Sequence, residues 1–407
     1  MIEWSEQHQQ IRDMVRRFVD TEIKPNLEAL EHGDTPPYDV LRKLFATFGL
    51  KEMGKMRFAA QLEKDKAGDS AKRESDRGGM GGGGDAIAMQ LIPIIELSRF
   101  CPGMVTALGV SVGLTAGAIM KKGTIAQKER WALDLLTLDK VGAWAITEPG
   151  SGSDAFGGMK ASARRDGDGY VLNGSKTFIT NGPYADTIVF ICKLDEGNDA
   201  AARKVVSFVL DRGMPGLTQS KPLRKMGMHS SPTGELFLED VKVGKDRLLG
   251  ETEDSSARSG AKETFTAERT GVAAMALGIV EQCLKLSTSY AKERVAFGRP
   301  IGEFQLIQLK LAKMEVARMN IQNLVFRIIE LGAAGKSMDI AEASACKLYC
   351  AQTAMDVALE AVQLFGGNGY MAEFQVEQLA RDAKVLQIYG GTDEIQISQI
   401  ARTLLSR

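Results

Sequence analysis

The spacing of apolar residues changes twice along this chain of 407 residues, and that change limits the folds available to it. Up to about residue 140, and again from about residue 255, apolar residues recur every three or four positions, as in amphipathic helices. Between these regions the period falls to two, which indicates β-strands. The pattern predicts an α+β multi-domain fold. We expect an N-terminal α-helical domain (1–140), a middle β-sheet domain (141–254) and a C-terminal α-helical bundle (255–407).

Four long helical stretches with short connections indicate that the C-terminal part is an up-down four-helix bundle. They are 259–296, 304–334, 338–366 and 373–388. In the middle part, TIVFICKL, KVVSFVL and GELFLEDVKV are rich in β-branched and aromatic residues and predict strands. The run YVLNGSKTFITNG predicts strands broken by two Asn-Gly turns.

Residues 55–85 contain a charged run followed by GGMGGGGD, and we expect a flexible surface insertion there. Gly79, Gly81 and Gly84 match the spacing GxGxxG of a dinucleotide-binding turn. No strand precedes them, so the match carries no weight and no nicotinamide-binding fold is expected.

Charge and residue counts exclude several classes of function. The net charge of −1 gives no support for binding to nucleic acid or to an anionic membrane. Three histidines, and five cysteines without a CxxC pair, support neither a metal site nor a disulfide framework. Residues 100–120 are uncharged and long enough to span a bilayer, but their Pro, Gly, Ser and Thr content favours a buried helix. The N-terminal stretch lacks the apolar run of a signal peptide, so a cytoplasmic protein is expected.

Six motifs carry the most specific signal. They are WAITEPGSGSD (144–154), NGSKTFITNG (173–182), ERTGVAAMALG (268–278), ERVAFGRPIGEFQ (293–305), QLFGGNGY (363–370) and RDAKVLQIYGGTDEIQ (381–396). In their order and spacing they resemble the acyl-CoA dehydrogenase family, over nearly the whole chain outside 55–85. The resemblance implies a barrel-like middle domain, FAD as cofactor, and α,β-dehydrogenation of an acyl-CoA thioester to the trans-2-enoyl-CoA.

The residue types in these motifs agree with flavin chemistry. Thr147 and Ser153 place hydroxyls on a glycine-rich loop that a ligand can approach closely. Phe178, where the family usually has tryptophan, offers a flat face beside the Thr180 hydroxyl. Arg294 suits a pyrophosphate because its guanidinium presents a fork of donors. By resemblance, the FAD-binding residues are Trp144, Ile146, Thr147, Ser153, Phe178, Ile179, Thr180, Arg294, Phe297, Gln305, Gln363, Gly366, Gly367, Thr392 and Glu394.

One position departs from the usual family pattern. Most members carry the catalytic glutamate where this chain has Gly390. A minority, including long-chain and isovaleryl-CoA dehydrogenases, place it on an earlier helix just before an arginine. Glu268, followed by Arg269, occupies that position here. Gly390 is then expected to leave space for the thioester, while its backbone N–H polarises the thioester oxygen.

The sequence around Glu268 supports its assignment as the base independently. Glu268 interrupts an apolar stripe formed by Phe265, Val272, Met275 and Ile279, at steps of three and four residues. A carboxylate that faces an apolar site has a raised pKa, which suits a general base. On the stripe alone, a solvated glutamate paired with a cation remains the alternative.

The resemblance bears less directly on the acyl group. It makes the helix around 101–113 the floor of the acyl pocket, where medium-chain members carry long polar side chains. Val105 and Gly109 stand there in this chain and predict a deeper pocket for a long-chain or bulky acyl group, with a short branched, isovaleryl-type group as the alternative. The expected substrate-binding residues are Ser153, Arg269, Gly390, Gly391, Val105 and Gly109.

The resemblance also implies partners. Electrons are expected to pass to an electron-transferring flavoprotein. The alternatives are an acyl-CoA oxidase, which uses oxygen, and a non-catalytic flavin-fold protein. Arg294, Phe297 and the turn 363–367 resemble residues that reach the FAD of a neighbouring subunit, so we expect a homo-oligomer, a dimer of dimers.

Overall fold

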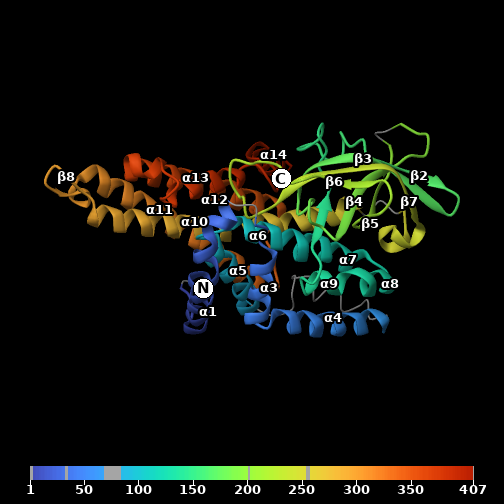
Figure 1. The fold of residues 1–407 in the computed structure, drawn as a ribbon, viewed down its shortest axis with the longest axis horizontal. Coiled ribbons are helices and arrows are strands. Elements are labelled where there is room, and N and C mark those ends of the chain that lie inside the picture. Colours follow the sequence, from blue (N-terminus) through green and yellow to red (C-terminus); the bar gives the residue numbers. More distant parts are fainter. Residues whose placement is uncertain (1–2, 33–34, 68–83, 200–201, 254–256, 407) are drawn as a thin grey trace.

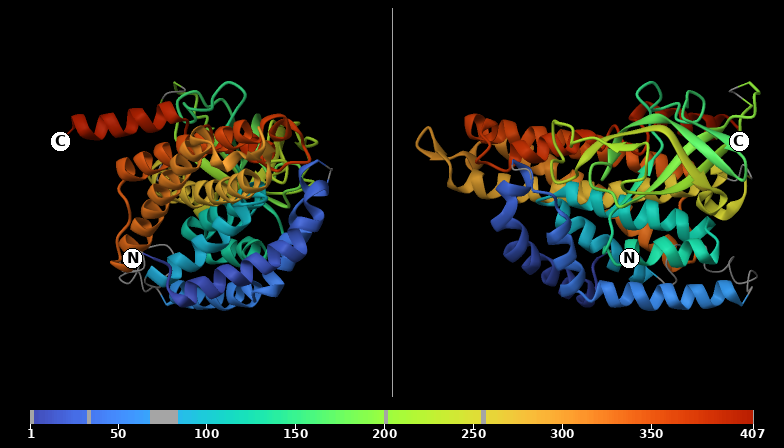
Figure 2. Two further views of the ribbon diagram at one scale, coloured as in Figure 1. Left: turned by 90° about the vertical axis from the view of Figure 1, so that its left-hand side faces the viewer. Right: turned by 45° about the vertical axis from the view of Figure 1, so that its right-hand side comes forward.

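The computed structural model of the protein describes residues 3–32, 35–67, 84–199, 202–253 and 257–406. N-terminal helices, a β-sheet and C-terminal helices follow one another along the chain (Figure 1). The sheet lies toward one end of the molecule, and the C-terminal helices extend to the opposite end (Figure 1 and Figure 2). The predicted α+β architecture, with a sheet domain between two helical ones, is confirmed.

The N-terminal region consists mainly of short helices. Their bounds are α1 Glu6–Phe18, α2 Leu27–Glu31, α3 Tyr38–Thr47, α4 Leu50–Lys66, α5 Gly84–Ser98, α6 Pro102–Leu108, the π-helical stretch η4 Gly109–Ala116, α7 Gly117–Lys122, α8 Ile125–Gln127 and α9 Leu133–Leu136. Side chains define several of their starts. The Ser5 hydroxyl accepts a hydrogen bond from the His8 N–H at 3.3 Å, and Thr124 and Gln127 form a capping box.

The uncharged stretch of the sequence becomes one helical run, Pro102–Lys122. Among the residues that the structure describes, it is the one helix long and apolar enough to cross a membrane. Met104, Ala116 and Ile119 on this run are fully buried in two hydrophobic cores, and the run packs against strand β1, Gly142–Ala145. Core packing therefore accounts for part of its apolar composition, since 44% of its most apolar window is buried.

The expectation of a flexible insertion over 55–85 was wrong for its first part. Helix α4 continues to Lys66, because Phe58 and Leu62 on it are buried in a core that also contains Trp131. Residues 68–83, which hold most of the glycine run, lie outside the described residues. The sequence hides the helix, since few apolar residues stand among its many charged ones.

Seven strands form one sheet. They are β1 Gly142–Ala145, β2 Ser162–Asp166, β3 Gly169–Thr180, β4 Thr187–Leu194, β5 Val205–Asp211, β6 Leu217–Gln219 and β7 Thr233–Gly244. The order is β1-β4-β2-β3-β7-β6, with β5 also paired to β4. The runs TIVFICKL, KVVSFVL and GELFLEDVKV correspond to β4, β5 and β7, which confirms those strand predictions.

The two Asn-Gly pairs, one within β3 and one directly after it, behave differently, and the prediction of two turns was wrong for the first. β3 continues through Asn173 and Gly174, where its register against β7 shifts. The Asn173 amide exchanges hydrogen bonds with Asp240, at 3.0 and 2.9 Å. A Cβ on Gly174, which has φ +145°, would lie 2.6 Å from the Cβ of Ala161, so the glycine permits a close approach and not a reversal.

The second pair does turn the chain, and its asparagine joins three parts of the molecule. Asn181 has φ +64° and is fully buried. Its side-chain amide donates to the carbonyl oxygens of Ala107 and Gly142, each at 2.9 Å, and its Oδ1 accepts from the Tyr38 hydroxyl at 2.9 Å. One side chain thus ties α3, α6 and β1 to the end of β3.

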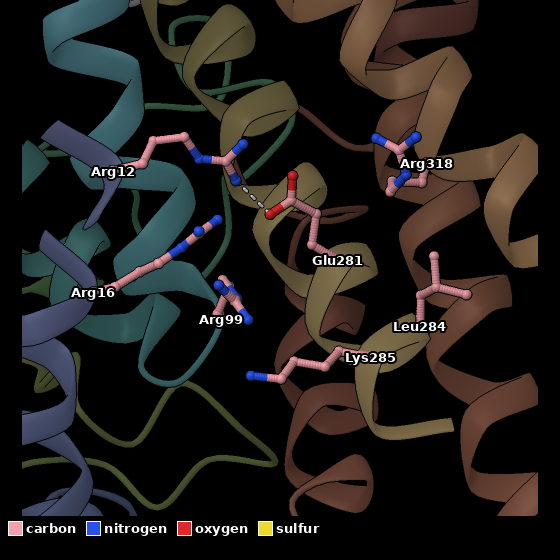
Figure 3. Close-up of a pocket in the computed structure, with 7 residues that line it drawn as sticks. All are labelled: Arg12, Arg16, Arg99, Glu281, Leu284, Lys285 and Arg318. Atoms are coloured by element: carbon pink, nitrogen blue, oxygen red, sulfur yellow. Dashed lines mark hydrogen bonds and ion pairs between the residues drawn. The ribbon is translucent and has the colours of Figure 1, made fainter. Parts of the chain in front are cut away.

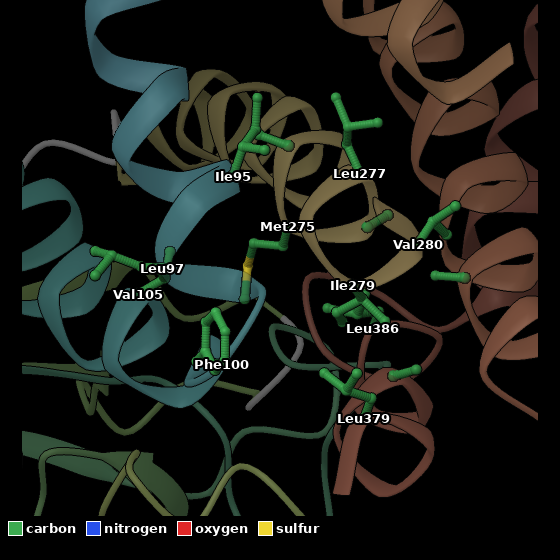
Figure 4. Packing of buried hydrophobic residues seen from close by; sticks show 14 of the residues in the cluster. Ile95, Leu97, Phe100, Val105, Met275, Leu277, Ile279, Val280, Leu379 and Leu386 are labelled. Carbon is green, nitrogen blue, oxygen red and sulfur yellow. The ribbon is translucent and has the colours of Figure 1, made fainter. Parts of the chain in front are cut away.

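The C-terminal region contains the four predicted long helices and a fifth. They are α10 Ala257–Glu293, α11 Gln305–Ala333, α12 Ile340–Phe365, α13 Val376–Val385 and α14 Asp393–Leu405, and the short hairpin β8 Val295–Ala296 and β9 Arg299–Pro300 joins α10 to α11. Asp339 caps α12 in a capping box with Glu342. Met275 and Ile279 of α10 pack with Phe100, Val105 and Leu379 in the largest core (Figure 4).

The Asn181 side chain gives a stability prediction. Asn181→Ala leaves two buried carbonyl oxygens and a buried hydroxyl without this partner, and each unsatisfied group costs about 1–3 kcal/mol. We expect the thermal unfolding midpoint to fall by several degrees. Asn173→Ala, at the exposed Asn-Gly pair, is the matched control and should change the unfolding free energy by about 1 kcal/mol or less. Equal losses in the two variants would contradict the role given to Asn181.

Candidate active site

Glu268 and Gly390, which are 122 positions apart in the sequence, meet in the structure. Gly390 lies in the turn between α13 and α14 and has φ +62°. A Cβ built on it would lie 3.3 Å from Cδ of Glu268 and 3.5 Å from its Oε1. The carboxyl group of Glu268 therefore occupies the space beside the position where most family members carry their glutamate.

The surroundings of Glu268 set its acidity. Val272, Met275 and Ile279, one to three turns along α10, are all buried, while Glu268 itself is only half-buried. Desolvation raises the pKa of Glu268 to about 7, although the charges of Arg269 and Lys347 act in the opposite direction. Its protonated and ionised forms are thus both available near neutral pH, as a general base requires.

Two fully buried side chains hold the turn at Gly390 and Gly391. Gln396 Nε2 donates to the carbonyl oxygens of Gly390 at 3.0 Å and Gly391 at 2.7 Å. Lys347 Nζ donates to the Gly391 carbonyl oxygen at 2.8 Å. Within the described part of the chain, neither N–H of the two glycines donates a hydrogen bond to the protein. These two N–H groups remain free to bind a ligand.

Sequence reasoning missed both buried anchors. Gln396 is the last residue of the motif 381–396, but the sequence predicted no role for it. Lys347 is the only basic residue in the sequence of α12. A lone lysine in an otherwise apolar helix face was the available signal. Arg269, which was predicted, donates from Nη1 to Ser344 Oγ on α12 at 3.0 Å.

Helix α6 reaches the same turn through Tyr389. The Tyr389 hydroxyl contacts Met275 Sδ at 3.2 Å and interacts with the Thr106 side chain. Of the two predicted floor residues, Val105 is 9% exposed and packs in the core (Figure 4). Gly109 is exposed, and a Cβ on it would meet nothing within 4 Å. Open space therefore lies at Gly109 and not at Val105.

The sheet domain presents a second group of predicted residues. Phe178 has φ +57° and is 68% exposed, at a register shift in β3 between Lys176 and Ile179. Two hydrogen bonds fix the neighbouring backbone. The Thr177 N–H donates to the Thr147 carbonyl oxygen at 3.0 Å, and the buried Lys176 Nζ donates to the Ile146 carbonyl oxygen at 2.9 Å. An exposed aromatic ring held in a strained conformation suits a flat ligand.

The other predicted residues of this group differ in what they can offer. Trp144, Thr147 and Thr180 are half-buried and Ser153 is exposed, so their side chains are accessible to a ligand. Ile146 and Ile179 are 8% and 2% exposed, and both belong to hydrophobic cores. These two residues can offer a ligand little beyond their backbone atoms.

A third group lies far away, near the end of the bundle that is remote from the sheet (Figure 1). Its predicted members are all exposed, and they are Arg294, Phe297, Gln305, Gln363, Gly366 and Gly367. Phe297 is 95% exposed. Along α10, about 1.5 Å per residue separates Arg294 from Glu268 by roughly 40 Å. One chain does not bring this group to Phe178 or to Glu268.

Thr392 and Glu394 lie next to the Gly390 turn at the start of α14. The Thr392 hydroxyl caps that helix by accepting from the Ile395 N–H at 3.4 Å, and Glu394 is exposed.

A surface cavity lies away from this site. It measures about 440 Å³ and lies between α1, α5, α10 and α11 (Figure 3). Arg12 bonds Glu281 there at 2.6 Å, and Arg12, Arg16 and Arg99 share Glu96. Glu281 is about 20 Å along α10 from Glu268. We interpret this network of ion pairs as a structural contact that holds the N-terminal helices against the C-terminal bundle.

Comparison with known proteins identifies the family. Residues 5–56 and 77–139 match the acyl-CoA dehydrogenase N-terminal domain, 143–241 the middle domain and 259–405 the C-terminal domain. The chain belongs to the acyl-CoA dehydrogenase family. Acyl-CoA dehydrogenases are flavin-dependent oxidoreductases, and this enzyme uses FAD. Among the described residues, no group of His, Cys, Asp and Glu could hold a metal ion.

Several relatives cover nearly the whole enzyme. The short-chain specific acyl-CoA dehydrogenase of Megasphaera elsdenii is 39% identical over 334 residues, which are 82% of this chain and 85% of that protein. The mitochondrial isovaleryl-CoA dehydrogenase of Oryza sativa subsp. japonica is 34% identical over 397 residues, 97% of this chain and 90% of that protein. The solved structure of butyryl-CoA dehydrogenase from Megasphaera elsdenii superposes with a TM-score of 0.82, at 33% identity and with 100% of both chains covered.

The acidity of Glu268 can be measured directly. Since burial raises its pKa to about 7, the carboxyl group should keep its proton below pH 7 and lose it above. Infrared difference spectra between the wild type and Glu268→Gln should show a protonated-carboxyl band that disappears with a midpoint near pH 7. Glu253, whose pKa is lowered to about 2 mainly by its hydrogen bond from Arg165, supplies the control: Glu253→Gln should show no such band. A midpoint near pH 4.5 for Glu268 would contradict its desolvation by the surrounding residues.

Proposed function

We propose that Glu268 is the base of this acyl-CoA dehydrogenase and removes the α-proton of an acyl-CoA thioester. The observation that carries the proposal is the position of its carboxyl group against Gly390, with Oε1 3.5 Å from a Cβ built there. The same space receives the proton in enzymes with a glutamate at that turn, and here a different helix supplies the carboxylate. Glu268→Gln, described below, tests this.

The residues around Glu268 divide the work of the reaction. Glu268 accepts the α-proton onto a carboxylate oxygen. The free N–H groups at Gly390 and Gly391 point to a site where the thioester oxygen would gain negative charge and be stabilised. Bound FAD supplies the acceptor for the hydride that leaves the β-carbon. Trp144, Thr147, Ser153, Phe178 and Thr180 would hold its ring system.

Glu268→Gln keeps the size of the side chain and removes the base. FAD content should stay at the wild-type level, while the rate of flavin reduction by acyl-CoA falls by a factor on the order of 10²–10⁴. Anaerobic stopped-flow bleaching of the flavin measures that rate. The double variant Glu268→Gly with Gly390→Glu should regain part of it, because the new carboxylate approaches the same space from the other wall. Wild-type bleaching by Glu268→Gln would mean that the base lies elsewhere.

For the acyl group we propose a long-chain or bulky substrate. The support is Gly109, which is exposed and has open space where its side chain would stand. Relatives named short-chain specific and isovaleryl-CoA dehydrogenases favour a second candidate, a short straight or branched acyl group. The two candidates differ in whether the space at Gly109 is filled by substrate.

Gly109→Leu tests the acyl pocket. Overpacking costs about 1–3 kcal/mol, so kcat/KM for palmitoyl-CoA should fall about tenfold or more, while that for butyryl- and isovaleryl-CoA changes little. Gly109→Ala should give a smaller effect of the same kind. An equal loss for every chain length would contradict the assignment of this space to the acyl tail.

We also propose that the working enzyme is a dimer at least, and a dimer of dimers in its full assembly. The residues expected to bind one FAD lie toward opposite ends of the folded subunit. A second subunit must therefore bring Arg294, Phe297 and the Gln363 turn close to Phe178. An exposed apolar face on α11 supports further association. Its members are Leu306 at 75%, Leu309 at 50%, Val316 at 58% and Met319 at 51% exposed.

Light scattering of the FAD-loaded enzyme should give about two or four times the chain mass of 44.1 kDa. The paired substitutions Val316→Glu and Met319→Glu should lower the assembly state by placing charges in an apolar contact. Asp356→Glu, outside that face, is the control. An FAD-loaded monomer would contradict the proposal.

Electrons should leave through an electron-transferring flavoprotein. If the enzyme were instead an acyl-CoA oxidase, oxygen alone would support turnover without a dye acceptor. A protein loaded with FAD that no acyl-CoA bleaches would indicate a non-catalytic role.

We further propose that the enzyme is cytoplasmic and that its domain boundaries lie near residues 140 and 254.

A further inference from the structure

Lys347 is a fully buried cation beside the proposed base. It lies on α12, its side chain is 0% exposed, and Nζ donates to the Gly391 carbonyl oxygen at 2.8 Å. Nζ also lies 3.5 Å from Asp393 Oδ1, in the first turn of α14. Burial of an ammonium group is costly unless it is hydrogen-bonded and paired. The cost of burying the Lys347 ammonium group and its position near Glu268 indicate a role beyond linking α12 to α14.

The ionisable groups that act on Glu268 come from three elements. Arg269 follows it on α10, Lys347 comes from α12 and the Tyr389 phenol from the turn before Gly390, while Asp393 of α14 acts on Lys347. Arg269 and Lys347 both lower the pKa of Glu268 against the effect of burial. The pKa of Lys347 is itself lowered, chiefly by burial, while Asp393 acts to raise it.

We propose that Lys347 is a positioning residue for the reaction: it fixes the peptide turn that presents the N–H groups of Gly390 and Gly391, and it places a positive charge next to the carboxyl group of Glu268. The proposal rests on the role given to Glu268 above. One ammonium group would then act both on the base, Glu268, and on the N–H groups that donate to the thioester oxygen.

The chain offers a way to separate the two effects. Gln396 also donates to the carbonyl oxygens of Gly390 and Gly391, but it is neutral. Gln396→Leu should loosen the turn and leave the charge near Glu268 intact. Lys347→Met should do both, and Lys347→Arg should restore the charge with donors in place. Lys310→Met, at a partly exposed lysine that pairs with Glu360, is the control.

Two measurements follow from this design, each on FAD-loaded enzyme. The first is the pH dependence of flavin bleaching by the fastest acyl-CoA of a panel from butyryl- to palmitoyl-CoA and isovaleryl-CoA. The second is the infrared band of a ¹³C-labelled thioester carbonyl of that acyl-CoA, bound to each variant in a Glu268→Gln background where turnover is blocked. A donor held against the oxygen lowers the frequency of that band.

Lys347→Met should move the acidic limb of the pH profile upward by about one unit and return the carbonyl band toward its frequency in water. Gln396→Leu should shift the band alone, and Lys347→Arg should reverse both changes at least in part. If Lys347→Met lowers only the unfolding temperature, with limb and band as in the wild type, the inference is wrong and Lys347 is structural.

The outcome is separable from the identity of the base. If Glu268→Gln bleaches at the wild-type rate, the proposed function fails first. If that variant is inactive while Lys347→Met keeps the wild-type pH profile and band, only this inference fails. Should Lys347→Met not fold, Asp393→Asn replaces it, because loss of the counter-charge should release the Lys347 side chain from the turn. An unchanged band in that variant would then overturn the proposal.

Discussion

The geometry of the enzyme depends on one buried amide. Asn181 hydrogen-bonds to Tyr38, Ala107 and Gly142, and so fixes two N-terminal helices and the first strand against the end of β3. Phe178 lies three residues before it on that strand, and the helix that passes Ala107 continues directly to Gly109. The exposed ring of Phe178 and the open space at Gly109 are therefore both positioned through the same side chain. Because these polar groups are buried and hydrogen-bonded to one another, the arrangement tolerates little displacement.

Acidity at the proposed base arises from opposed effects, of which desolvation is the larger. Desolvation alone would keep the Glu268 carboxyl group protonated, and two adjacent cations alone would keep it ionised. Their balance places the pKa near 7, where a carboxylate is basic enough to remove a proton and a substantial fraction of it is still ionised at neutral pH. Gly390 contributes space, since any side chain there would meet the carboxyl group.

Local patterns sufficed wherever a segment's own residues decide its structure. The apolar run of β4 and the stripe of α10 are of this kind, and a charge that interrupts such a stripe is visible without coordinates. Asn173 and Asn181 show the limit: both precede glycine, yet one pairs with Asp240 inside a continuous strand and the other turns the chain. The difference lies in what packs against each. Lys347 and Gln396 escaped notice because their partner, the Gly391 carbonyl, becomes a neighbour only after folding. The helical start of 55–66 was hidden because its burial depends on two residues, Phe58 and Leu62.

The length of α10 has a consequence for inheritance. The single helix α10 carries Glu268 in its first third and leads to Arg294 just past its end. In the proposed dimer these residues serve different cofactors, the chain's own and its neighbour's. Damage at Arg294 would then spare the site that contains the same chain's base and disable the partner's. Two mutant alleles, one altered at each end of this helix, would together still encode one complete site in a mixed dimer. In the proposed dimer, the unit on which selection acts at this site would be the pair of chains.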